Sequence, residues 1–220
     1  MTVEMVFFDI GGVMYDDTVY ARSWREALRE SGGSFTDEEF AAEYAAARAA
    51  QSGSFRRRLT LAFLGTDRDL DAVEARAARS WAYPPSALYP DVVPCLEALE
   101  GRVRLGVIAN QPSSVRTAME RDGLAGFFEV WGVSDDLGLQ KPDPELFSHV
   151  LATARVDAAR TVMLGDRLDY DVRPATAAGM RAVWVLRGEA PDDPSTEQLS
   201  EADASVRDLG EVPALVSSWS

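Results

Sequence analysis

Polar residues follow short apolar runs at three points along the chain, and their types could support chemistry at a shared site. Asp9 follows the run VFF, Asn110 follows GVIA, and Asp166 follows VMLG. A single residue of this kind is commonly only a turn former or a helix cap. The combination with a lysine in the loop QKPDPELF (Lys141) and a further acid (Asp171) is harder to reach by chance. We therefore expect a functional site built from carboxylates, an amide and one positive charge.

These runs belong to a region in which strands and helices alternate. Apolar strands that alternate with amphipathic helices indicate a parallel sheet covered on both faces. Ligands of such sheets bind beyond the carboxyl ends of the strands, where the three polar residues are expected. The pattern predicts strands at 2–9, 102–109, 128–133, 161–164 and 181–186, helices at 92–99, 113–122, 145–154 and 171–178, and a short apolar element at 206–216.

The segment between the first strand and the rest of the sheet differs in composition and in the spacing of its apolar residues. From Thr18 to Tyr83 it is rich in Ala, Leu, Glu and Arg at helical spacing, without a strand signal. Roughly four helices are expected there, bounded by Pro84, Pro85 and Pro90. The predicted fold class is α/β, with a Rossmann-like parallel sheet core (1–14 and 88–220) and a helical segment (15–87) inserted after the first strand.

Composition excludes several classes of partner and cofactor. The 220 residues carry 22 Lys+Arg against 36 Asp+Glu, a net charge of −14, which disfavours binding to nucleic acid or to an anionic membrane. Cys95 and His149 are single residues of their types, so no cysteine- or histidine-built metal cluster is expected. No apolar run reaches the roughly 18 residues of a membrane span, and the N-terminus does not resemble a signal peptide. We expect a cytoplasmic protein, a monomer or homodimer, acting on a small molecule.

Four segments together resemble the motifs of the haloacid dehalogenase-like (HAD) hydrolase superfamily. VFFDIGGVMYDD resembles the first motif, GVIANQ the second and QKPDPELF the lysine motif. VMLGDRLDYDVRPATAAGM resembles the acidic fourth motif, which is the most specific of them. The helical insertion also matches the place of the cap in many such enzymes. The chain thus resembles a helical-cap (C1) phosphatase-like member with Asp-x-Gly in its first motif.

The resemblance implies hydrolysis of a small phosphorylated substrate through a covalent intermediate. Asp9 would attack phosphorus and form an aspartyl-phosphate, which water then hydrolyses. Lys141 would place a positive charge against Asp9 and the transferring phosphoryl group. Asn110 would donate hydrogen bonds to the phosphoryl oxygens.

The resemblance also implies Mg²⁺ as the cofactor. Its ligands would be Asp9, the main-chain carbonyl of Gly11 and Asp166, with Asp171 orienting a water of the ion or ligating through it. Such oxygen ligands suit a hard divalent cation. Gly12 would let the backbone approach the phosphate.

Two departures from the family pattern predict a slower enzyme. Gly11 stands where phosphatases of the family have a second Asp that protonates the leaving group, and general acid catalysis is typically worth ~10²–10⁴-fold. Ala109 stands where a hydroxyl would contact the phosphoryl group, and one such donor is worth ~10²-fold or more.

Compensation for these losses could come from the substrate or from neighbouring residues. A substrate with a good leaving group, such as an anomeric sugar phosphate, would need less help. Asp16, Asp17 or a cap glutamate could supply the proton, and Ser113 or Ser114 the hydroxyl. Gly11→Asp is expected to raise the rate on poor leaving groups unless another acid is already in place.

Two other functions compete with the phosphatase. A 2-haloacid dehalogenase would use the same nucleophile on carbon without a metal, but its fourth motif is neutral, whereas this chain has Asp166, Asp169 and Asp171. These carboxylates near Asp9 would repel one another strongly without a cation. A catalytically weakened binding or scaffold protein is the other alternative.

Substrate choice is expected to depend on the cap. Arg56, Arg57 and Arg58 are consecutive on a predicted helix, so they cannot all face the same way. At least one of them could bind an anionic part of the substrate, although a solvated face is the commoner role for such a run.

Overall fold

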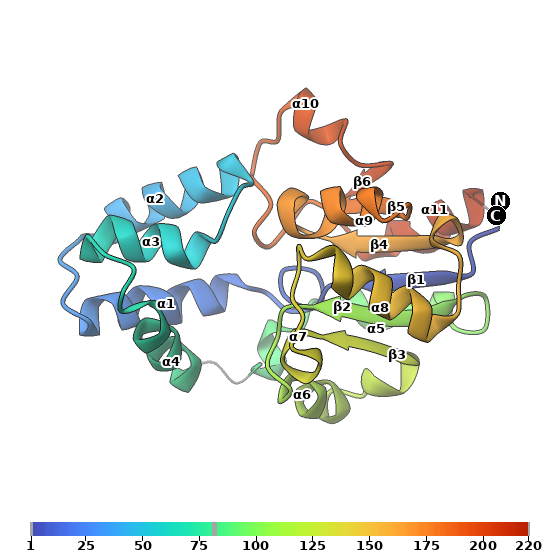
Figure 1. Ribbon diagram of the computed structural model, residues 1–220, viewed down its shortest axis with the longest axis horizontal. Coiled ribbons are helices and arrows are strands. Elements are labelled where there is room, and N and C mark those ends of the chain that lie inside the picture. Colours follow the sequence, from blue (N-terminus) through green and yellow to red (C-terminus); the bar gives the residue numbers. More distant parts are fainter. Residues whose placement is uncertain (1, 81–82, 220) are drawn as a thin grey trace.

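A six-stranded parallel sheet forms the centre of the fold (Figure 1), in a computed structural model that describes residues 2–80 and 83–219. The strand order is β3-β2-β1-β4-β5-β6, and every neighbouring pair is parallel. The strands are β1 (Met5–Phe8), β2 (Arg104–Ala109), β3 (Val130–Val133), β4 (Thr161–Gly165), β5 (Arg181–Val185) and β6 (Ala204–Val206).

The first strand lies at the point where the strand order reverses. β1 pairs with β2 on one side and with β4 on the other, so that Phe8 lies opposite Val107 and Leu164. All four of its side chains are buried, as expected for an apolar strand covered on both faces. A crevice forms beyond the carboxyl ends of the strands at such a reversal, and Asp9 is the residue that follows β1.

Helices cover both faces of the sheet. Val6 and Phe8 join a cluster with α5, α6 and α11, and Met5 and Phe7 join a second cluster with α8 and α9. Successive side chains of β1 thus point to opposite faces. The helices of the sheet layers are α5 (Val92–Leu99), α6 (Val115–Arg121), α7 (Ser134–Leu137), α8 (Pro144–Ala154), α9 (Arg173–Ala177), α10 (Thr196–Leu199) and α11 (Val212–Ser218).

In the described residues between β1 and α5, four α-helices stand apart from the sheet, at the carboxyl end of its strands (Figure 1). Their sequence signals are local: Thr36 accepts a hydrogen bond from the Glu39 N–H (3.1 Å), and Glu39 accepts one from the Thr36 N–H (2.7 Å), which starts the second helix. Trp24, Leu28 and Phe40 belong to a separate apolar cluster. These helices, called the cap below, are α1 (Thr18–Glu30), α2 (Asp37–Ala50), α3 (Phe55–Leu64) and α4 (Leu70–Ser80).

The parallel sheet with a helical insertion after its first strand confirms the predicted fold class. The division into two domains at residues 15 and 87 stays a prediction. No helix in the described ranges is long and apolar enough to cross a membrane.

The segment after β4 and the tail differ from the sequence prediction. A π-helical turn, Leu168–Val172, precedes α9 in place of one helix at 171–178. The Asp171 carboxylate accepts a hydrogen bond from the N–H of Arg167 (3.0 Å), the residue before this turn, whose N–H has no acceptor within the turn itself. In the tail, β6 adds a three-residue edge strand, too short to give a periodic signal.

The cap contacts the sheet layers through Gln51, a fully buried residue at the end of α2. Its side-chain oxygen accepts a hydrogen bond from the Leu168 N–H (2.8 Å), and its nitrogen donates one to the Glu189 carbonyl (2.8 Å). The Arg167 guanidinium donates to the Gly53 carbonyl (2.8 Å) and lies 3.7 Å from the ring centre of Phe55. We call these contacts the Gln51 clasp.

Candidate active site

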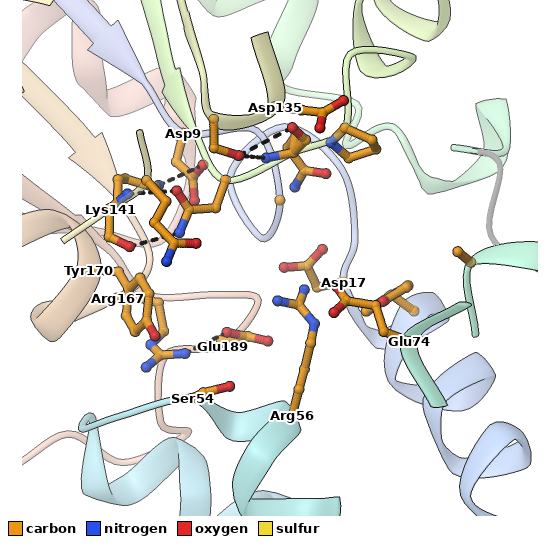
Figure 2. A pocket seen from close by; sticks show the side chains of 18 of the residues that line it. Asp9, Asp17, Ser54, Arg56, Glu74, Asp135, Lys141, Arg167, Tyr170 and Glu189 are labelled. Carbon is orange, nitrogen blue, oxygen red and sulfur yellow. Dashed lines mark hydrogen bonds and ion pairs between the residues drawn. The ribbon is translucent and has the colours of Figure 1, made fainter. Parts of the chain in front are cut away.

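A cavity of about 1630 Å³ lies between the cap and the carboxyl edge of the sheet (Figure 2). Asp9, Asn110 and Asp166, which follow the neighbouring strands β1, β2 and β4, line it together with Lys141 and Asp171. The structure thus brings together the side chains that the sequence analysis placed at one sheet edge.

Lys141 connects two of the acids. Its Nζ lies 2.9 Å from Asp9 Oδ1 and 2.6 Å from Asp171 Oδ1, and the side chain is 3% exposed. Burial alone lowers the pKa of this ammonium group, but the Asp171 and Asp9 carboxylates outweigh burial and raise the pKa. Lys141 therefore stays charged beside Asp9.

Asn110 holds the backbone of Lys141. Its Oδ1 accepts a hydrogen bond from the Lys141 N–H (2.7 Å), and its Nδ2 donates one to the Lys141 carbonyl (2.9 Å). An amide nitrogen carries two N–H groups, so one remains for another acceptor. The expected role of Asn110 as a phosphoryl donor stays a prediction, and the structure adds this contact that fixes Lys141.

Three buried carboxylates converge beside this lysine. Ligand oxygens of Asp9, Asp166 and Asp171 lie within 4.8 Å of one another. Burial raises the pKa of Asp9 to about 7, with Lys141 opposing the rise and Asp171 adding to it. Burial, with the charges of Asp9 and Asp171, also raises the pKa of Asp166 well above its usual range. One lysine does not balance three carboxylates, and a hard divalent cation with oxygen ligands fits this donor set.

The position of Asp166 depends on two glycines with positive φ. A Cβ on Gly12 (φ +66°) would lie 2.0 Å from Asp166 Oδ2, and one on Gly188 (φ +61°) would lie 2.5 Å from the same atom. The Glu189 N–H donates to that oxygen at 2.6 Å. The sequence analysis assigned Gly12 to phosphate approach; in the structure the absent side chain makes room for Asp166.

Of the three consecutive cap arginines, Arg56 is the one that lines the cavity. Arg57 pairs with Asp67 (2.7 Å), and Arg58 pairs with Glu43 (2.6 Å). Within residues 2–80 and 83–219, Arg56 forms no ion pair, and its buried Nε has no hydrogen-bond partner. In Figure 2 its guanidinium reaches from α3 toward Asp17 and Glu189.

The charges around Arg56 are close enough to affect its ionisation. Burial lowers the pKa of the guanidinium, but nearby oxygens, led by those of Tyr20 and Glu189, outweigh burial and raise the pKa. Glu74 and Asp17 add to this effect. Among the described residues on the cap side of the cavity, Arg56 is therefore a cation close to several acidic groups.

The residues expected to compensate for Gly11 and Ala109 lie partly inside the cavity lining and partly outside it. The Asp16 carboxylate accepts a hydrogen bond from the Thr18 N–H (2.9 Å), as a turn former does. The Ser113 hydroxyl donates to Asp135 (2.9 Å), whereas Ser114 and Asp17 line the cavity. Burial, with the charges of Glu189 and Asp9, raises the pKa of Asp17 well above its usual range.

The sequence analysis missed Arg167 and Glu189, which form an ion pair at 2.9 Å in the wall of the cavity. Arg167 follows Asp166 directly, and Glu189 follows the end of β5 by four residues. A polar residue after the fifth predicted strand was the available signal for Glu189. Arg167 had none, because an arginine in an acidic motif is equally compatible with a solvated role.

Comparisons with known proteins identify the family to which this fold and site belong. A family model described as haloacid dehalogenase-like hydrolase matches residues 3–179. The phosphoserine phosphatase of Thermus thermophilus is 34% identical over 196 residues, which cover 86% of this chain and 76% of that protein.

Two solved structures share the whole fold. The putative HAD-hydrolase YfnB of Bacillus subtilis, bound to magnesium, has a TM-score of 0.74 and 20% identity, with 98% of this chain and 99% of that chain covered. The 2-haloacid dehalogenase of Pseudomonas syringae pv. tomato has a TM-score of 0.63 and 26% identity, with 100% of both chains covered. Since the fold accommodates different reactions, the choice of reaction must come from the residues in the cavity.

Proposed function

The chain belongs to the family of haloacid dehalogenase-like hydrolases, and from that membership we propose that it is a phosphatase that hydrolyses a small phosphomonoester through an aspartyl-phosphate on Asp9. The observation that carries this proposal is the buried group of Asp9, Lys141, Asp166 and Asp171 at the reversal point of the sheet. The identity to a relative named phosphoserine phosphatase supports the same reaction class.

Asp9 supplies the nucleophile in this proposal. One carboxylate oxygen forms a bond to phosphorus while the bond from phosphorus to the leaving oxygen breaks, and water then hydrolyses the acyl phosphate. Lys141, 2.9 Å from Asp9 Oδ1, favours the charged carboxylate despite burial and offsets negative charge on the incoming phosphoryl group. Asn110 fixes the Lys141 backbone and has one N–H left to donate to the phosphoryl group.

Mg²⁺ is the proposed cofactor. Asp9, Asp166 and the main-chain carbonyl of Gly11 would hold it, with Asp171 beside them. When bound, the ion would offset the repulsion between the carboxylates and the phosphoryl group. The crowding of three carboxylates around one lysine supports this assignment.

The same feature disfavours a 2-haloacid dehalogenase. A dehalogenase of this fold would displace halide without a metal, and the acids of the fourth motif would then repel one another and the Asp9 nucleophile. A weakened binding or scaffold protein is the remaining alternative, because Gly11 and Ala109 lack two of the groups that assist turnover in the family.

A release assay separates these functions. The protein is incubated with Mg²⁺ and a panel of sugar phosphates, nucleotides, phosphoserine and p-nitrophenyl phosphate, and with 2-chloropropionate, in the presence and absence of EDTA. We expect phosphate release from at least one phosphomonoester, abolished by EDTA. Halide release that EDTA does not affect would identify a dehalogenase. No release from any compound, with Mg²⁺ still bound, would favour the binding protein.

The remaining parts of the proposal concern setting and partners. We place the reaction in the cytoplasm, with the chain acting as a monomer or homodimer on a small phosphorylated substrate. The net charge of −14 supports a partner other than nucleic acid or an anionic membrane.

A further inference from the structure

The space beside Gly11 is occupied by the carboxyl group of another residue. A Cβ built on Gly11 would lie 2.9 Å from both carboxylate oxygens of Asp17 and 3.1 Å from Gln111 Nε2. Any side chain at residue 11 would therefore enter the volume that the Asp17 carboxyl now fills. The chain has lost an acid at one position and carries another acid, six residues later, in the space beside it.

The turn after β1 brings Asp17 to this place. The Met14 N–H donates to the Ile10 carbonyl (2.8 Å), and the Gly12 N–H donates to the Tyr15 carbonyl (2.8 Å), so the chain folds back over Gly11. Asp17 is the residue before α1, and its carbonyl accepts the first hydrogen bond of that helix, from the Ala21 N–H (2.9 Å). The Asp17 backbone is thus held at its carbonyl by α1, and the turn before it is closed by its own hydrogen bonds.

The Asp17 side chain does not cap the helix that it precedes. An aspartate in the N-cap position ordinarily accepts a hydrogen bond from the first turn, but Asp17 makes no such capping bond. Asp16 is the neighbouring acid whose carboxylate bonds to the turn. The Asp17 side chain lines the cavity instead, on the side of Asp9 that faces Arg56 (Figure 2).

We propose that Asp17 is the general acid and base of the reaction and replaces the side chain that Gly11 lacks. This assignment rests on the proposed phosphatase function, and it depends on where the carboxyl lies. Asp16 is disfavoured for the role because its carboxylate already accepts a hydrogen bond from the Thr18 N–H in the adjoining turn.

The proton transfers balance over two steps. In the first, the bond from Asp9 to phosphorus forms, the bond from phosphorus to the leaving oxygen breaks, and its electron pair accepts the proton of Asp17. In the second, the Asp17 carboxylate takes a proton from water as the water oxygen bonds to phosphorus. The bond from Asp9 to phosphorus then breaks, releasing inorganic phosphate with Asp9 ionised and Asp17 protonated again.

A leaving-group comparison tests this role. Asp17→Asn and the control Asp16→Asn are compared with the wild type on phenyl phosphate and p-nitrophenyl phosphate, two similar probes whose leaving groups differ in basicity. For Asp17→Asn we expect kcat/KM, which covers the steps up to release of the leaving group and not the later hydrolysis of the aspartyl-phosphate, to fall by ~10²–10⁴-fold on phenyl phosphate and by less than ~10-fold on p-nitrophenyl phosphate. Asp16→Asn should lower kcat/KM only slightly, and to the same extent on the two probes. Equal losses of kcat/KM on the two probes in Asp17→Asn would overturn the proposal, since a structural role does not depend on the leaving group.

This assay distinguishes a failure of the phosphatase function from a failure of the role assigned to Asp17. A wild type that releases phosphate from neither probe nor any ester of the panel refutes the phosphatase function, and the role of Asp17 falls with it. A wild type that is active, loses activity in Asp9→Asn and is unchanged in Asp17→Asn retains the function and refutes only the role of Asp17.

A position swap provides the second test. Gly11→Asp alone should lower activity, because its side chain would meet the Asp17 carboxyl at 2.9 Å from the Cβ. In the double variant Gly11→Asp/Asp17→Gly the new acid has that space to itself, and Gly is a tolerated N-cap residue. We expect the double variant to hydrolyse phenyl phosphate at least ~10-fold faster than Asp17→Gly alone. Equal rates in these two variants, at equal thermal unfolding midpoints, would overturn the proposal.

Discussion

The two walls of the cavity are built differently. On the sheet wall, Lys141 contacts Asp9 and Asp171 at 2.9 and 2.6 Å, and Asn110 binds the Lys141 backbone on both sides. On the cap wall, within residues 2–80 and 83–219, the Arg56 guanidinium forms no ion pair and leaves Nε without a partner. The side chains of the sheet wall are thus held in place by ion pairs and hydrogen bonds, whereas Arg56 on the cap wall has an N–H group that bonds to nothing in the described residues.

In the proposed phosphatase, this difference would assign the reaction to the sheet wall and the choice of substrate to the cap wall. Groups that must act on every substrate are held by strand ends in a fixed register, where small displacements would be costly. Groups with free donors can adapt to whatever part of a substrate lies beyond the phosphate. We therefore expect substitutions in the sheet wall to change kcat strongly, and substitutions in the cap wall to change KM for particular substrates.

The largest effect is expected for Asp9→Asn. The amide is nearly the same size as the carboxylate but cannot form the acyl phosphate, so kcat should fall by at least ~10⁴-fold. Phosphate release with the best substrate of the panel measures the loss, and an unchanged thermal unfolding midpoint shows that the fold is intact. Activity near that of the wild type would refute the covalent route.

Lys141→Met is expected to be the next most severe change. It removes the positive charge beside Asp9 and should lower kcat by on the order of 10²–10³-fold. It also leaves two buried carboxylates unpaired, and breaking a buried ion pair costs about 3–5 kcal/mol of unfolding free energy. Urea unfolding without Mg²⁺ measures the second effect, with Arg104→Met, an exposed sheet residue paired with Glu129, as the control. A stability loss no greater than that of the control would contradict the buried pairing.

Mg²⁺ should stabilise the sheet wall without any substrate. A ligand at 100 times its dissociation constant raises the unfolding free energy by about 2.7 kcal/mol, so the thermal midpoint of the wild type should rise with Mg²⁺. Asp166→Asn removes a proposed ligand and should largely abolish the rise, whereas Asp135→Asn, farther along the same cavity wall, should preserve it. The same rise in all three proteins would place the ion elsewhere.

The smallest effect is expected on the cap wall. Arg56→Gln should raise KM for the best substrate by about tenfold, the worth of a hydrogen bond to a charged group, with little change in kcat. Arg57→Gln is the matched control, because Arg57 pairs with Asp67 away from the cavity. A fall in kcat comparable to that of Lys141→Met would remove the distinction between the two walls.

The fold and the sheet wall were largely predictable from the sequence because their signals are local. Apolar runs mark the strands, and a residue directly after a strand must lie at the sheet edge, which places Asp9, Asn110 and Asp166 together. The helix predicted at 92–99 has the bounds of α5. The family resemblance added the roles of these residues, which remain predictions.

Sequence reasoning left only alternatives for the cap wall, because the choice among them depends on how the cap meets the sheet. Three adjacent arginines look alike in the sequence, and only the rotation of α3 selects Arg56 for the cavity. Gly11 signalled a missing acid, but the turn that brings Asp17 beside it is defined by backbone hydrogen bonds with no sequence motif. The same limit applies to Gln51, a polar residue whose complete burial depends on two distant segments.

Through the Gln51 clasp, the position of the cap affects the segment that follows Asp166. Swinging the cap away from the sheet would strip the Leu168 N–H of its acceptor and part the Arg167 guanidinium from the Gly53 carbonyl and the Phe55 ring. Arg167 and Leu168 directly follow Asp166, and Leu168 begins the turn that carries Asp171. The cap and the turn that carries Asp171 thus depend on the same contacts, so an opening of the cap would remove hydrogen bonds that hold the segment between Asp166 and Asp171.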